Sequence, residues 1–204
     1  DILWYKHEIF AINSLVLGNF QELKKFSNNC GLLNEYAVLN FNERFFDYGL
    51  GRISYVLLSD NEALIQRYAK LRYQRGVNAE LSMDEMVAIG ELPIWCNTVQ
   101  FFMADDNAGV ERNLNIIESK TLKSLPKKEE GLKDDYEFYK ALHNGDRAKM
   151  EEVLEKLVSP KIHKKRNDNP ILNQYISLPA LGYAKLAWRK GIEVDVNSDL
   201  IPNE

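Results

Sequence analysis

The chain has few of the residues from which metal and disulfide sites are built: three histidines and two cysteines among 204 residues. Cys30 and Cys96 lie 66 positions apart, and no two histidines are close enough in sequence to suggest a shared metal site. This spacing argues against a disulfide framework or a thiolate metal site and favours free, buried thiols in a reducing compartment. We therefore expect a cytoplasmic protein with no metal ion or other cofactor; a single disulfide is the alternative.

Long apolar runs and an excess of positive charge are also absent. The apolar stretches fall far short of the ~20 residues of a membrane-spanning helix, and the first residues carry no cleavable signal pattern. The 26 basic and 30 acidic residues give a formal net charge of −4, so the chain has no excess of positive charge that would attract nucleic acid. We expect neither a membrane nor a nucleic-acid partner, and a basic or neutral protein fits better. Because the chain starts at Asp1 instead of Met, we also expect residues before it in the full protein.

No group of residues in the sequence is typical of catalysis. Gly49 and Gly51 lack the third glycine and the preceding strand of a phosphate-binding loop, so we interpret them as sites of close helix packing. The histidines, at positions 7, 143 and 163, have aromatic, apolar or lysine neighbours and fit structural or surface roles. We predict that the chain is not an enzyme; the alternative is a dispersed active site in which His7 or His143 meets carboxylates.

What the sequence does contain is a helical pattern broken four times by short turns rich in glycine, asparagine and aspartate. If Asn19, Asp60, Asn107 and Asp146 are equivalent, the turns recur at intervals of 41, 47 and 39 residues, as in a repeated α-hairpin. The sequence therefore predicts an all-α fold. We expect a stack of about four antiparallel α-hairpins, similar to a tetratricopeptide or α-solenoid array, with a C-terminal helix and a short extended tail.

Local signals predict where several helices begin and end. Asn19 and Ser82 precede apolar helical patterns, and Glu22 and Glu85 stand three residues further on, in the position of a capping box. Pro93 predicts a break in the third unit, with a fresh helix after it.

The chain is expected to form one domain over residues 1–204, and the polar segment 119–131 is the candidate for a subdivision. The charged segment 161–170 is interpreted as exposed. A final helix over 175–188 is expected, followed by an extended stretch at 192–196, where apolar and acidic residues alternate.

The last part of the chain, ISLPALGYAKLAWRKGIEVDVNSDLIPNE from Ile176 to Glu204, resembles the C-terminal signature of the immunity protein 49 family. The hairpin over 136–158 is similar to the helical region of the same family, so the resemblance covers about the last third. That family is associated with bacterial polymorphic toxin systems. The resemblance implies a cytosolic, all-α antitoxin that binds a cognate toxin domain and blocks it without catalysis, and it brings no catalytic residues with it. The residues that carry it are Leu178, Pro179, Ala180, Leu181, Ala184, Ala187, Gly191, Leu200, Ile201 and Pro202.

Clustered carboxylates are the candidate contacts for such a partner, because toxin domains that attack nucleic acid or nucleotides present basic active sites. The alternative interpretation is helix capping and solvation, since Asp106 and Asp134 stand at expected helix starts. The basic run of Lys161, Lys164, Lys165 and Arg166 is interpreted as a solvated loop or a rim of protein contact. The hypothesis places partner contacts at Asp105, Asp106, Glu129, Glu130, Asp134 and Asp135.

A second function fits the same pattern, namely a tetratricopeptide-like adaptor that binds a peptide or a regulatory protein in its groove. An adaptor would bind an extended segment even when its partner is unfolded, whereas an immunity protein would need the folded toxin. Either function is compatible with a homodimer that forms through exposed aromatic side chains, such as Trp188 or Tyr183.

Overall fold

The computed structural model describes residues 2–41, 50–73, 81–129, 131–167 and 172–202. Within these ranges the chain forms helices joined by short turns and contains no strand, so the predicted all-α class is confirmed. None of the described helices combines the length and the apolarity that a membrane-spanning segment needs. Short π-helical or 3₁₀ turns lie at Ile117–Thr121, Lys127–Glu129 and Leu172–Gln174. In chain order the helices are α1 (Ile2–Val16), α2 (Phe20–Phe41), α3 (Ile53–Leu58), α4 (Glu62–Lys70), α5 (Met83–Ile89), α6 (Ile94–Met103), α7 (Asn107–Ile116), α8 (Leu122–Ser124), α9 (Leu132–Asn144), α10 (Arg147–Val158), α11 (Pro160–Arg166) and α12 (Leu178–Arg189).

The same kind of turn joins consecutive helices at four places. In each turn a residue with positive φ is followed directly by an asparagine or aspartate, whose Oδ1 accepts a hydrogen bond from the backbone N–H three residues later. The left-handed residue ends one helix and the capping side chain starts the next. The observed caps are 42, 45 and 40 residues apart, because Asn61 and Asp106 are the caps instead of their predicted neighbours. The pairs are Gly18–Asn19, Asp60–Asn61, Asp105–Asp106 and Gly145–Asp146.

Three further predicted boundaries agree with the structure, whereas the final helix begins at Leu178 instead of residue 175. Ser82 and Glu85 form a complete capping box at the start of α5. Gly90, with a φ of 88°, ends α5, and Pro93 stands directly before the first residue of α6, which gives the expected break. Gly191, with a φ of 75°, follows α12.

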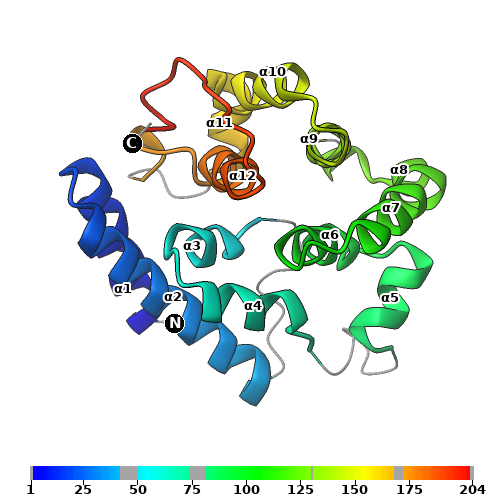
Figure 1. The fold of residues 1–204 in the computed structure, drawn as a ribbon, viewed down its shortest axis with the longest axis horizontal. Helices are drawn as coiled ribbons and strands as arrows, with labels where there is room; N and C mark the ends of the chain where they lie inside the picture. The colour runs from blue at the N-terminus through cyan, green and yellow to red at the C-terminus, as the bar shows by residue number, and fades with distance from the viewer. Residues whose placement is uncertain (1, 42–49, 74–80, 130, 168–171, 203–204) are drawn as a thin grey trace.

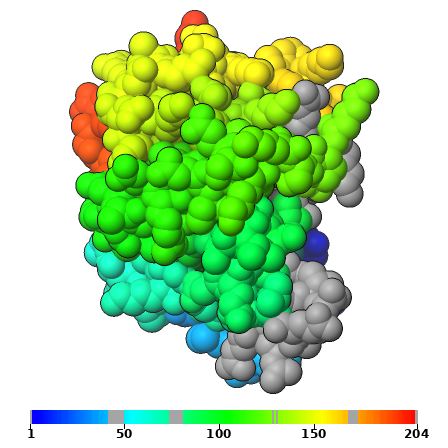
Figure 2. Space-filling model, turned by 90° about the vertical axis from the view of Figure 1, so that its right-hand side faces the viewer, coloured from blue at the N-terminus to red at the C-terminus, as the bar shows by residue number. Residues whose placement is uncertain are grey.

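The helices do not form an open row. Neighbours in the chain pack together, α1 on α2, α6 on α7 and α9 on α10, but α12 returns from the C-terminal part to pack against α3 (Figure 1). In an open array each unit contacts only the units next to it. The regular stack of four hairpins is therefore not confirmed, although Figure 2 shows that the segments from α4 through α7 to α10 lie as successive bands on one face.

The C-terminal tail packs back along α12 and is bonded near both ends of that helix. The Trp188 indole N–H donates to the Val194 carbonyl oxygen at 3.0 Å, and the Ser177 N–H donates to the Leu200 carbonyl oxygen at 2.9 Å. Val194 and Val196 are buried while the acidic residues between and before them are exposed, as the alternating pattern indicates. The tail is thus extended along the surface and inserts alternate side chains into the core.

Two expectations are wrong, namely the exposed aromatic side chains and the loop conformation of the basic run. Tyr183 is buried, with 1% of its surface exposed, and Trp188 is partly buried, so neither is an exposed aromatic that could carry a homodimer. Residues 160–166 form a helix, α11, instead of a loop; it starts with Pro160 and buries His163, while Lys161, Lys164 and Lys165 are exposed as expected. Proline is favoured at the first position of a helix, because its missing N–H would have no partner there.

Candidate functional site

The carboxylates predicted to contact a partner fall into two groups. Asp105 and Asp106 lie in the turn between α6 and α7, and both are exposed. Asp105 pairs with the ammonium group of Lys190, and Asp106 Oδ1 accepts from a backbone N–H of α7 at 2.9 Å. Glu129 lies in the 3₁₀ turn before α9, and Glu130 lies outside the described residues. A helix cap and an ion pair thus hold the exposed pair in a defined position.

Asp134 and Asp135 lie in the first turn of α9 and face inward, with exposed fractions of 8% and 2%. Asp134 Oδ1 accepts from Lys156 Nζ of α10 at 2.5 Å. Asp135 Oδ1 accepts from the Arg166 guanidinium of α11 at 2.8 Å and from the Tyr183 hydroxyl of α12. These two carboxylates therefore tie α9 to three other helices and are not part of an exposed acidic patch.

Burial and the charge of Asp135 together set the pKa values of the side chains around this carboxylate. Burial and the neighbouring Asp135 charge raise the pKa values of Tyr183 and Tyr139 well above that of a free tyrosine. Burial lowers the pKa of Arg166, but the charge of Asp135 and the hydrogen bond to it outweigh that effect and raise the pKa overall. Neither tyrosine nor the arginine titrates near neutral pH, so the geometry is that of an ion pair that positions helices.

A basic groove lies beside this ion pair, between the start of α9 and the helices α10 and α11. Its volume is about 570 Å³, and five cationic side chains line it against two carboxylates. Lys161 and Lys165 are one helical turn apart on α11, which brings both to the groove. Glu129 and Asp134, two of the carboxylates predicted to contact a partner, thus lie at a groove whose charged lining is mainly basic. The charged lining residues are Glu129, Lys133, Asp134, Lys156, Lys161, Lys165 and Arg166.

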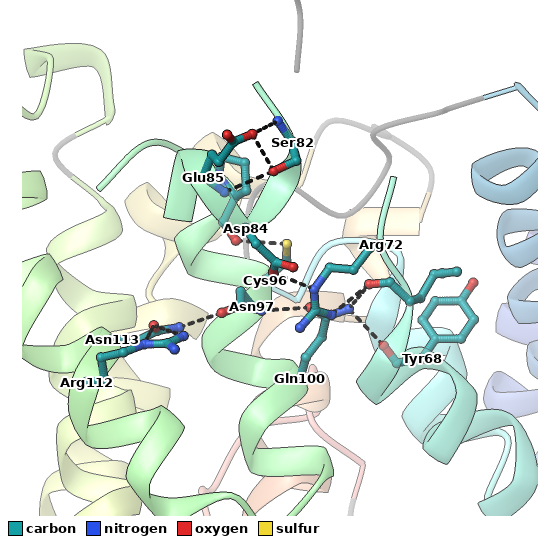
Figure 3. Close-up of polar contacts among 12 residues, drawn as sticks. Tyr68, Arg72, Ser82, Asp84, Glu85, Cys96, Asn97, Gln100, Arg112 and Asn113 are labelled. Carbon is teal, nitrogen blue, oxygen red and sulfur yellow. Dashed lines mark hydrogen bonds and ion pairs between the residues drawn. The ribbon is translucent and has the colours of Figure 1, made fainter. Parts of the chain in front are cut away.

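A buried polar network joins α4, α6 and α7 (Figure 3). Gln100 Nε2 donates to the carbonyl oxygens of Tyr68 and Leu71, at 2.8 and 2.7 Å. Gln100 Oε1 accepts from Asn97 Nδ2 at 3.2 Å, and Asn97 Oδ1 accepts from Asn113 Nδ2 at 2.9 Å. The three amide side chains are fully buried. The network gives carbonyl groups at the end of α4 a second donor from α6, so its role is to fix the positions of the helices.

Two arginines extend the network to the surface. Arg72 donates to Gln100 Oε1 at 3.0 Å and to Asp84 Oδ1 at 2.8 Å. Arg112 donates to Asn113 Oδ1 at 3.2 Å. Both line a cavity of about 340 Å³. Each guanidinium already donates to acceptors within the protein, so these internal hydrogen bonds hold the two arginines in place at the cavity wall.

Histidine, cysteine and carboxylate side chains are dispersed in the part of the chain that the structure describes, where no three of them are grouped to hold a metal ion. His163 Nε2 lies 2.5 Å from the carbonyl oxygen of Asn173, and the His7 ring lies 5.8 Å from the ring of Phe26. Cys30 and Cys96 are free and buried, as predicted. Burial raises the pKa of Cys30 to about 12, so this thiol stays protonated at neutral pH.

Comparison with known proteins extends the resemblance seen at the C-terminus. A family described as immunity protein 49 matches residues 47–204, from before α3 to the end of the chain. No curated protein and no solved structure matches the chain. The matched residues include the exposed aspartate pair, the buried ion pair and the basic groove, whereas α1 and α2 lie before them. The chain belongs to the immunity protein 49 family.

Proposed function

We propose that this protein is an antitoxin that binds the cognate toxin domain of a bacterial polymorphic toxin system and neutralises it by direct contact, without catalysis. The family match over residues 47–204 carries this proposal. The surroundings of the buried carboxylates Asp134 and Asp135 support it, because each pairs with a cation of another helix and so holds helices together. The free, buried thiols of Cys30 and Cys96 fit action in the cytoplasm.

The exposed turn between α6 and α7 is the proposed contact for a basic surface of the toxin. Asp105 and Asp106 present two carboxylates next to each other on a turn whose backbone is fixed by the α7 cap. A pre-positioned charge pair loses little conformational freedom on binding. Glu129 and Glu130 remain further candidates, and we assign Asp134 and Asp135 to the positioning of α9.

The function is tested by capturing the tagged protein from its native host and identifying the bound material by mass spectrometry. The proposal expects one stoichiometric partner that is toxic when expressed alone and harmless when co-expressed with this chain. It also expects binding to be lost when that partner is unfolded. Recovery of unrelated proteins that share a short segment, with binding that survives their unfolding, would instead establish the peptide-binding adaptor.

The contact site is tested by the double variant Asp105→Asn and Asp106→Asn. Asparagine keeps the cap of α7 and tolerates the positive φ of Asp105, so the variant removes charge and preserves the turn. We expect the affinity for the toxin to fall by about 10-fold or more, with slower association at low salt. Asp146→Asn is the control, because Asp146 caps α10 in the same way. An unchanged affinity would exclude this turn from the interface while leaving the antitoxin function intact.

A further inference from the structure

Exposed apolar side chains are concentrated in the α1–α2 hairpin. Among the described residues, twelve of the fifteen large apolar side chains that are exposed belong to residues 2–41. The other three are Leu81, Ile89 and Tyr175. Such a concentration on one element marks an interaction surface, because scattered single residues are the ordinary pattern. The twelve are Ile2, Leu3, Tyr5, Ile9, Phe10, Val16, Leu17, Phe20, Leu32, Tyr36, Leu39 and Phe41.

Helix α1 is apolar on both its inner and its outer face. From Ile2 to Val16 its only Lys, Arg, Asp or Glu side chains are Lys6 and Glu8, and Glu8 is buried. Within the described fold, α1 packs mainly on α2, and the two helices lie along one edge of the molecule (Figure 1). A helix that is apolar all round is normally covered on all sides. The outer face of α1 is therefore short of a covering element.

The outer residues are spaced as in a helix–helix contact. Ile2, Ile9 and Val16 recur every seven residues, and a second row repeats the same spacing beside it. Their exposed fractions are 90%, 54% and 52%. A seven-residue repeat of apolar side chains is the pattern along which two helices pack lengthwise. The second row is Leu3, Phe10 and Leu17.

We infer that the outer face of α1 binds the same face of a second copy of this chain, with the two α1 helices antiparallel and crossing at Ile9. An interface with two-fold symmetry requires a surface that complements itself, and a nearly uncharged apolar row meets that requirement. An antiparallel crossing at Ile9 places Ile2 opposite Val16 of the second copy. It also places Lys6 near Asn13 of the second copy and keeps the two lysines apart, so no like charges meet.

The family match supports a role separate from toxin binding. It begins at residue 47, so α1 and α2 lie outside the residues that the family model matches. The low charge of the α1 face also differs from the paired aspartates proposed to meet a basic toxin surface. The hairpin is thus assigned to self-association, and this assignment does not depend on the antitoxin proposal.

The test compares two matched substitutions in the full chain of residues 1–204. Ile9 and Ile89 are both 54% exposed, but Ile89 lies on α5, away from the proposed contact. We expect the wild type and Ile89→Glu to sediment as dimers at micromolar concentration. Ile9→Glu faces two carboxylates across the symmetry axis, so its dimer dissociation constant should rise by roughly 100-fold or more. Circular dichroism shows whether each variant keeps its helices.

A mixing experiment separates self-pairing from other causes of dissociation. Ile9→Glu and Ile9→Lys should each be monomeric alone and should form a mixed dimer when combined, because opposite charges then meet at the crossing point. A monomeric wild type, a dimeric Ile9→Glu, or a mixture that stays monomeric would each overturn the proposed interface. If the toxin rather than a second copy binds this face, Ile9→Glu lowers toxin affinity while the wild type alone is monomeric.

Discussion

At the scale of single residues, Asp60 links three elements. It lies in the turn between α3 and α4 with a φ of 51°, and its carboxylate pairs with Lys24 Nζ of α2 at 2.9 Å and Lys185 Nζ of α12 at 2.8 Å. Burial acts to raise the pKa of Asp60, but its hydrogen bonds and charge interactions with the two lysines lower it overall. The ionised carboxylate therefore stabilises the fold.

Asp60→Asn should lower the free energy of unfolding at pH 7 by about 1 kcal/mol, since two partly exposed ion pairs are lost. Asparagine tolerates the left-handed conformation, so the backbone is not the cause. Because the folded pKa lies below the unfolded one, this stabilisation is present above the unfolded value and is lost as the pH falls through the folded value. Urea unfolding should thus show a difference from wild type at pH 7 that disappears well below pH 3.8, the ordinary value for aspartate. An equal difference at both pH values would contradict the ion-pair explanation.

Glu8 should show the opposite dependence on pH. It is 9% exposed, and its Oε1 accepts from the Tyr55 hydroxyl at 2.8 Å. Burial raises the pKa of Glu8, and the hydrogen bond from Tyr55 and the charge of Arg52 offset only part of that rise. The ionised form is therefore unfavourable in the folded protein, and stability falls as the pH rises from the unfolded pKa through the folded one.

Glu8→Gln keeps an acceptor for Tyr55 and removes the buried charge. We expect the variant to exceed the wild type by about 1 kcal/mol in unfolding free energy at pH 7 and to match it well below pH 4.5, the ordinary value for glutamate, where Glu8 is protonated in both states. Chemical denaturation at the two pH values measures this. A variant that is less stable than the wild type at pH 7 would show that the charge of Glu8 contributes favourably, through Arg52.

At the scale of helices, the packing of α12 on α3 depends on the absence of a side chain at Gly182. A Cβ built there would lie 2.3 Å from Ser54 Oγ and 3.0 Å from Ser54 Cβ. Gly182→Ala should therefore force the two helices apart and cost about 1–3 kcal/mol of unfolding free energy, despite the better helix propensity of alanine. Gly131→Ala is the control, since it has no neighbour within 4 Å of the added Cβ and lies at the start of α9. Thermal unfolding should show a lower midpoint only for Gly182→Ala.

Helix ends were predictable because their signals are local. The turn residues and caps at Asn19, Ser82 and Asp146 act within three or four residues of the chain, and all three cap as expected. Whether a side chain at a helix start faces the solvent or the core depends on residues that are distant in the sequence. Asp135 could face the solvent or the core from the same position, and Arg166 from α11 together with Tyr183 from α12 makes the buried position favourable.

The polar network carried a weaker signal that was missed. Asn97 and Gln100 interrupt the apolar helix Ile94–Met103 at a spacing of three, which puts two amides on one side of a buried segment. Such residues need partners, because an unpaired buried amide is costly. The sequence could indicate that partners exist, but the carbonyl groups at the end of α4 and Asn113 on α7 are brought there by the tertiary fold.

At the scale of the whole molecule, the distribution of surface charge and the packing of α12 on α3 were the least predictable properties. The net charge is −4, yet two of the six predicted carboxylates, Glu129 and Asp134, line a groove with more cations than anions. Lysines and an arginine from α10 and α11, distant in sequence from the first turn of α9, produce this reversal. Composition reports only the total charge, and the fold decides how that charge is distributed.

Because α12 packs on α3, we expect residues before and after the segment 119–131 to unfold cooperatively. This expectation tests whether that segment divides the chain into two units. The buried side chains before and after this segment belong to one hydrophobic cluster, and the Tyr139 hydroxyl donates across it to the Trp95 carbonyl oxygen at 3.4 Å. Elements that share a core of this kind unfold together. We therefore expect one transition for residues 1–204.

Two single-tryptophan variants provide the measurement, because Trp95 lies on α6, before this segment, and Trp188 lies on α12, after it. In each variant the other tryptophans are replaced by phenylalanine, and urea unfolding is followed by fluorescence and by far-ultraviolet circular dichroism. Comparing the two probes within one variant cancels any loss of stability caused by the replacements. The two curves should coincide in both variants, with equal midpoints and slopes. If the Trp188 fluorescence changes at a lower urea concentration than the helical signal while the Trp95 fluorescence changes at a higher one, the chain contains two units, and α12 docks on α3 as an interface between them.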